Sequence, residues 1–84
     1  MKLKEWKKAK SICSKIIEVD NNIVKAWYRR GECSMHLEEF DEAKDDFHKV
    51  IQLEPTNKAA MNKYMECMNH KVIFYLVSNN HVIF

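Results

Sequence analysis

The sequence predicts an all-α fold in which about four antiparallel helices form helical hairpins. Three observations favour this fold class. Segments 34 positions apart resemble each other, and apolar residues recur within them at intervals of three and four. In addition, the 84 residues include one glycine, Gly31, and one proline, Pro55. So few turn-forming residues indicate helices joined by short connections.

The internal repeat emerges when the chain is aligned with itself at an offset of 34 positions. This alignment pairs identical residues: Leu3 with Leu37, Glu5 with Glu39, Ala9 with Ala43, Lys10 with Lys44, Lys15 with Lys49, and Ile17 with Ile51. This period is typical of the tetratricopeptide repeat (TPR), a helix–turn–helix unit that stacks into solenoids. We therefore expect an α-solenoid fragment.

Residues 1–23 are interpreted as the second helix of a truncated repeat. One apolar stripe runs along them, formed by Leu3, Trp6, Ala9, Cys13, Ile16 and Ile17. The first helix of that repeat would require about twenty further residues upstream of Met1. On this interpretation, part of the surface around Trp6, Cys13 and Ile16 faces water.

Residues 24–57 are interpreted as one complete repeat. Its first helix is expected to begin after the capping residues Asp20, Asn21 and Asn22 and to extend through Leu37. Its second helix is expected to end before Pro55, which cannot continue a helix. The residue types typical of the repeat follow at Trp27, Gly31, Phe40, Ala43, Phe47, Val50 and Pro55. Gly31 and Ala43 are small, which suits a close crossing of the two helices.

Residues 58–71 are expected to form a C-terminal capping helix, with Thr56 and Asn57 as its caps. Met61, Met65 and Met68 form a stripe on this helix. Methionine-rich faces can bind partners, but packing against the preceding helix is the preferred interpretation.

Residues 72–84 form an apolar tail. Its β-branched and aromatic residues have strand propensity, whereas the absence of a partner strand favours continuation of the helix to about Val77.

The composition argues against several function classes. A net charge of +2 and interspersed acidic residues do not indicate binding to nucleic acid or to a membrane. Three cysteines without C-x-x-C spacing suit reduced thiols, and no signal peptide is apparent, so a cytoplasmic location is expected. No cofactor and no catalytic residues are predicted, and the chain is interpreted as a non-enzyme.

The segment from Lys25 to Cys33, which contains the phrase K-A-x-x-R-R-G-E, resembles the last repeat of the TPR domain in large FK506-binding immunophilins. These proteins are co-chaperones with peptidyl-prolyl cis-trans isomerase domains. The resemblance extends over residues 1 to about 70 and implies a protein-interaction module that binds the acidic Glu-Glu-Val-Asp end of a heat-shock chaperone. The isomerase domains of the family would lie upstream of this chain.

The resemblance implies that Lys25 and Arg29 belong to a clamp for peptide carboxylates. A spacing of four places both cations on one helical face, together with Glu32 and His36. The family uses three further clamp residues, and all three positions fall upstream of Met1. An ordinary solvated face is the alternative interpretation of this basic pair.

Arg30 replaces an apolar repeat residue, and its stem is expected to cover Trp27 or a neighbouring helix while its charged head reaches solvent. Cys33 and His36 have a spacing that metals use, but no further ligand is suggested and no metal site is predicted.

A rival interpretation of the whole chain is structural. In it, a truncated solenoid piece has no specific ligand and self-associates through apolar surface that is exposed at both ends.

Overall fold

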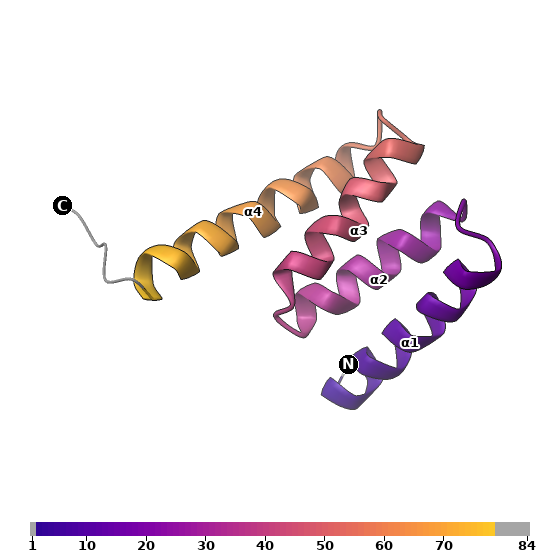
Figure 1. Cartoon of the computed structure of the whole chain (residues 1–84), viewed down its shortest axis with the longest axis horizontal. Helices are drawn as coiled ribbons and strands as arrows, with labels where there is room; N and C mark the ends of the chain where they lie inside the picture. The colour runs from indigo at the N-terminus through magenta and orange to yellow at the C-terminus, as the bar shows by residue number, and fades with distance from the viewer. Residues whose placement is uncertain (1, 79–84) are drawn as a thin grey trace.

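A computed structural model of the chain describes residues 2–78, of which residues 71–78 are described by their backbone only. The described part forms four helices: α1 (Leu3–Val19), α2 (Val24–His36), α3 (Phe40–Leu53) and α4 (Lys58–Ser78). Each helix packs on the next, so α2 and α3 lie between α1 and α4 (Figure 1). The predicted all-α fold of antiparallel helical hairpins is confirmed.

The connection before α2 differs from the prediction. Helix α2 follows Ile23, and none of the three predicted caps holds its first turn. Instead, the Asn22 backbone N–H donates to Asp20 Oδ1 at 3.0 Å, and Trp27 Nε1 donates to the carbonyl oxygen of Asn21 at 2.8 Å. These residues therefore stabilise the turn and hold the indole, rather than capping the helix.

The turn between α2 and α3 is tight. Glu38 adopts a left-handed backbone conformation with φ of 60°, which is uncommon for a residue with a side chain. The Glu39 backbone N–H then donates to the carbonyl oxygen of Ser34 at 2.8 Å. This bond satisfies one of the terminal carbonyl groups of α2 and directs the chain back along it.

The turn before α4 agrees with the prediction. Helix α3 ends two residues before Pro55, and Asn57 Oδ1 accepts a hydrogen bond from the Ala60 backbone N–H at 2.9 Å. Asn57 is thus the cap of α4. Helix α4 continues past residue 71 to Ser78, while residues 79–84 of the expected apolar tail lie outside the described residues.

The core lies between α2, α3 and α4. Ala43, Phe47 and Cys67 form its buried cluster, with Val50 and Ala60 also fully buried nearby. The ring of Phe47 lies directly over Gly31, and a Cβ atom at Gly31 would lie 2.8 Å from Phe47 Cζ. The predicted close crossing at Gly31 is therefore present, because the aromatic ring fills the space that a side chain would need.

The surface of α1 corrects one expectation. Cys13 is buried, whereas the large apolar residues exposed on this helix are Leu3, Ile12, Ile16 and Val19.

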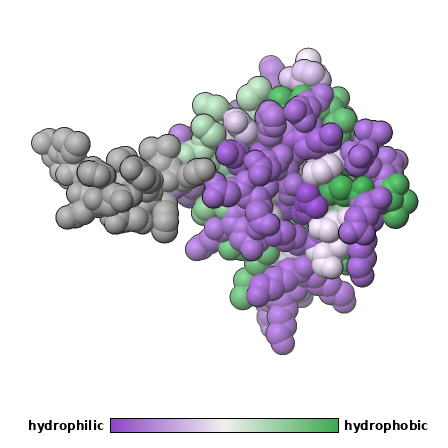
Figure 2. Space-filling model, in the orientation of Figure 1, coloured by the Kyte–Doolittle hydropathy of each residue, from purple (hydrophilic) through white to green (hydrophobic). Residues whose placement is uncertain are grey.

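On the face shown in Figure 2, hydrophilic residues cover most of the surface and hydrophobic residues appear as smaller separate areas. Within the described part of the chain, no helix has the length and apolar character that a membrane span requires.

Candidate peptide-carboxylate site

Lys25 and Arg29 both lie exposed on α2, one helical turn apart. They border an open hollow of about 700 Å³. Its other lining residues are Val24, Tyr28 and Glu32 from α2, together with Glu54, Asn57 and Ala59 from the α3–α4 turn and the start of α4. The structure thus places the two predicted site residues side by side at a concave surface.

Both cations are available to a ligand. Among the residues that the structure describes, the ion pairs involve Lys10 and Arg30, and neither Lys25 nor Arg29 takes part in one. The hollow also contains Glu32 and Glu54, so its formal charge is balanced. Recognition of an anion here must therefore depend on the local position of the two cations and not on a general positive field.

The packing of Tyr28 fixes this part of α2. Its ring meets the ring of Phe47 edge to face, with the centroids 5.3 Å apart. Because Phe47 is fully buried, this contact ties the helical turn between Lys25 and Arg29 to the core. The backbone positions of both cations are therefore set by the fold, while their long side chains stay free to adjust.

On its other side, Arg29 borders a smaller cavity of about 170 Å³, lined also by Trp6, Cys13 and Cys33. Burial raises the pKa of the Cys13 thiol, an effect that Arg29 and Arg30 reduce in part. Burial likewise raises the pKa of Cys33. Both thiols are free and protonated at neutral pH, so they behave here as packing groups.

His36 does not join Lys25 and Arg29 at the hollow. Its ring stacks on Trp6 of α1, with the centroids 3.7 Å apart. Cys33, its neighbour by spacing, is buried. In residues 2–70, no group of three or more metal-ligating side chains has metal-binding geometry.

A second stack repeats the first. The ring of His70 in α4 stacks on Phe40 of α3 at 4.4 Å, and both residues lie 34 positions after His36 and Trp6. Neither stack was predicted from the sequence. The spacing of these residues was the signal that could have revealed these contacts, because residues one repeat apart occupy equivalent positions.

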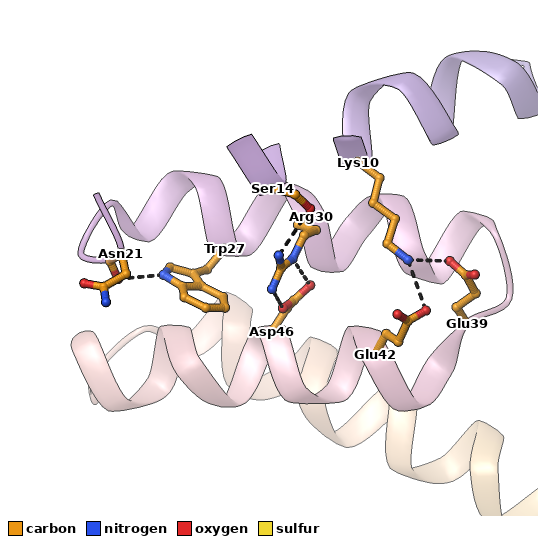
Figure 3. Close-up of polar contacts among 8 residues, drawn as sticks. All are labelled: Lys10, Ser14, Asn21, Trp27, Arg30, Glu39, Glu42 and Asp46. Atoms are coloured by element: carbon orange, nitrogen blue, oxygen red, sulfur yellow. Dashed lines mark hydrogen bonds and ion pairs between the residues drawn. The ribbon is translucent and has the colours of Figure 1, made fainter. Parts of the chain in front are cut away.

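The prediction for Arg30 is wrong in one respect. The guanidinium itself, and not only the stem, lies at Trp27, with Cζ 4.9 Å from the ring centroid. The charged head is mostly engaged within the protein: Nε and Nη2 donate to the two Asp46 oxygens at 3.0 and 2.8 Å, and Nη1 donates to Ser14 Oγ at 3.2 Å (Figure 3). Arg30 therefore joins α1, α2 and α3.

Asp46 is a buried acidic residue of α3. Burial raises the pKa of this carboxyl, and the hydrogen bonds from Arg30 act against that rise. The two-pronged contact favours the ionised carboxylate.

Lys10 of α1 forms a second link between α1 and the start of α3, at the surface. Its Nζ contacts Glu39 at 2.7 Å and Glu42 at 3.0 Å.

The preferred interpretation of the methionines is also wrong. Met61, Met65 and Met68 are exposed and do not form the contact of α4 with α3. That contact is made by Ala60 and Cys67, which are buried, and by Tyr64, which packs against the core cluster. The three methionines do form a stripe, as predicted, but this stripe lies on the exposed side of α4.

Comparison with known proteins supports this architecture. Residues 24–57 match the family described as tetratricopeptide repeat. The chain is 51% identical over 59 residues to FK506-binding protein 59 of Drosophila melanogaster, covering 70% of this chain and 13% of the relative. It is 42% identical over 67 residues to peptidyl-prolyl cis-trans isomerase FKBP4 of Mus musculus, and 40% identical over the same length to FKBP4 of Homo sapiens. Each FKBP4 match covers 80% of this chain and 15% of the relative.

Proposed function

Since the chain is a tetratricopeptide-repeat segment homologous to FK506-binding immunophilins, we propose that it binds the acidic C-terminal peptide of a heat-shock chaperone through Lys25 and Arg29. TPR segments are protein-interaction modules, so the partner is a protein. The proposal for this particular peptide goes further and rests on the two exposed cations at the hollow.

One observation carries the proposal: Lys25 and Arg29 are adjacent, exposed and outside the ion pairs of the described residues. A terminal carboxylate and an acidic side chain can then each accept charge-assisted hydrogen bonds. Contacts of this kind contribute about 1.5 to 3 kcal/mol each when they are shielded from water. Asn57 lines the same hollow, where its amide is held by Glu54 and by the Ala60 backbone N–H.

For residues 1–84 by themselves, a weak affinity is expected. The resemblance implies a clamp of five residues, and two of them correspond to positions in this chain. Without three contacts of about 1 to 2 kcal/mol each, a micromolar site becomes millimolar or weaker.

The isomerase activity in the name of FKBP4 belongs to that protein, of which this chain spans 15% of the length. We propose that residues 1–84 have no such activity, because the described helices provide no constellation of catalytic groups. A prolyl isomerisation assay that shows FK506-sensitive acceleration by this chain would contradict this.

Fluorescence anisotropy with a labelled peptide ending in Glu-Glu-Val-Asp tests the binding proposal. The expected result is a millimolar Kd, weakened about tenfold or more by Arg29→Ala or Lys25→Ala and by amidation of the peptide's terminal carboxylate. Lys8→Ala, which removes an exposed cation from α1, is the matched control and should leave the Kd unchanged. Equal loss in all three variants, or no effect of amidation, would contradict a specific carboxylate site.

A further inference from the structure

The two outer helices each have an apolar face whose large side chains are 39 to 54% exposed. On α1 this face includes Ile12 and Ile16, and on α4 it consists of Met61, Met65 and Met68. The two helices lie on opposite sides of the α2–α3 hairpin (Figure 1). These faces therefore cannot cover each other within one copy of the chain in this arrangement.

The 34-residue register shows what each face is built to contact. Helix α4 is equivalent to α2, so its exposed methionines correspond to Trp27, Gly31 and Ser34. In α2, these positions belong to the side that packs on α3. Gly31 lies against the ring of Phe47, the Trp27 ring has Lys49 Nζ 5.7 Å from its centroid, and Ser34 is fully buried.

Helix α1 is correspondingly equivalent to α3. Ile12 and Ile16 occupy the positions of Asp46 and Val50, both of which are buried in α3. The Asp46 carboxylate contacts Arg30 of α2. The exposed side of α1 is therefore equivalent to the side of α3 that contacts α2. The exposed side of α4 is equivalent to the side of α2 that contacts α3.

We propose that this chain associates head to tail, with α4 of one copy packing against α1 of a second copy. The contact recreates the α2–α3 hairpin between two chains. Because the two surfaces are different, each copy retains one free α1 and one free α4, and the contact extends into a string of copies instead of closing as a symmetric dimer.

Side-chain sizes support the match. In the complete repeat, Gly31 accommodates the large ring of Phe47. The composite repeat, formed by α4 of one copy and α1 of another, has a large residue, Met65, on α4 and a small residue, Cys13, on α1 at the equivalent positions. The large and small partners have exchanged sides, so the summed volume of the contact is roughly retained.

Polarity supports it as well. The Arg30–Asp46 ion pair of the complete repeat is replaced by Tyr64 and Ile12 at the equivalent positions. Neither replacement carries a charge, so the contact between α4 of one copy and α1 of another leaves no buried charge without a partner. A random pair of exposed apolar faces would not be expected to compensate at both positions.

Two single variants test the proposal by sedimentation velocity across a range of concentrations. Ile12→Glu changes a residue that is 50% exposed and blocks α1, and Met65→Glu changes one that is 54% exposed and blocks α4. The wild-type chain should form concentration-dependent oligomers, and each variant alone should be monomeric. Their equimolar mixture should form a 1:1 heterodimer, because one intact α4 then meets one intact α1.

Ser11→Glu is the matched control: it introduces the same charge beside Ile12, at an exposed position whose equivalent in α3, Asp45, is also exposed. It should associate like the wild type. Should thermal melting show that either variant is unfolded, Ile16→Glu and Met61→Glu form a second pair on the same two faces. A wild-type chain that is monomeric at millimolar concentration would overturn the proposal. So would a dimer formed by either single variant, or a mixture that stays monomeric.

Discussion

At Gly31 and Phe47, α2 and α3 cross closely, with the aromatic ring of Phe47 resting on the backbone of Gly31. The ring is fully buried. This relationship holds α2 against α3, and Tyr28, which positions the basic pair, packs on the edge of the same ring.

Gly31→Ala is therefore expected to destabilise the fold by about 1 to 3 kcal/mol, although alanine is the better helix former. The added methyl group would meet Phe47 Cζ at 2.8 Å. Chemical denaturation followed by circular dichroism measures the change. In the double variant with Phe47→Leu, the cost of the added methyl group should be smaller, because the shorter side chain leaves room for it. Additive losses in the double variant would show that the ring is not the obstacle.

Arg30→Ala should cost about 3 to 5 kcal/mol, because it leaves the buried Asp46 carboxylate without its partner. Arg30→Ala combined with Asp46→Ala should recover part of that loss, since no buried charge then remains. The comparison requires the free energy of unfolding of the two single variants and the double variant. A double variant as unstable as the sum of the singles would contradict a coupled pair.

Ser34 provides a prediction of the opposite sign. Its hydroxyl is fully buried, and its Oγ makes no hydrogen bond to any described residue. Ser34→Ala removes this group with little change in volume, so it should be neutral or stabilise the fold by about 1 kcal/mol. Thermal melting decides this, and a clear loss of stability would indicate that the hydroxyl has a partner in solution.

Cys67 predicts a pH dependence. Burial raises the pKa of its thiol from 9.0 to about 11. A raised folded-state pKa means that the neutral thiol contributes stability that is fully present below the unfolded-state pKa, near 9, and is lost as the pH rises through about 11. Between pH 9 and 11, the wild type should therefore lose more unfolding free energy than Cys67→Ala. Parallel pH profiles for the two proteins would contradict this account.

The fold could be predicted because its determinants are local. The sequence itself contains the 34-residue repeat, the spacing of the apolar residues and Pro55. These features predict four helices in the observed order without knowledge of tertiary contacts. The site residues Lys25 and Arg29 were predicted to share a face, which follows from helical geometry alone.

The errors concern side chains whose environment depends on neighbouring helices. The burial of Asp46 could not be predicted from its own amphipathic helix, because it depends on the partner Arg30, sixteen positions earlier. The methionines were assigned to the core because their apolarity is visible while the side that they occupy is not. Applying the repeat register to each residue would have placed them on the side of α4 that no other helix among the described residues 2–78 contacts.

Binding of a peptide carboxylate by Lys25 and Arg29 can be mapped through the backbone amide shifts of the chain during titration with a Glu-Glu-Val-Asp peptide. We expect the shifts to concentrate on residues 24–32 and on Asn57 around the hollow, and to vanish when the peptide's terminal carboxylate is amidated. Shifts confined to α1 or to the methionine face of α4, or shifts that are unchanged by amidation, would contradict it.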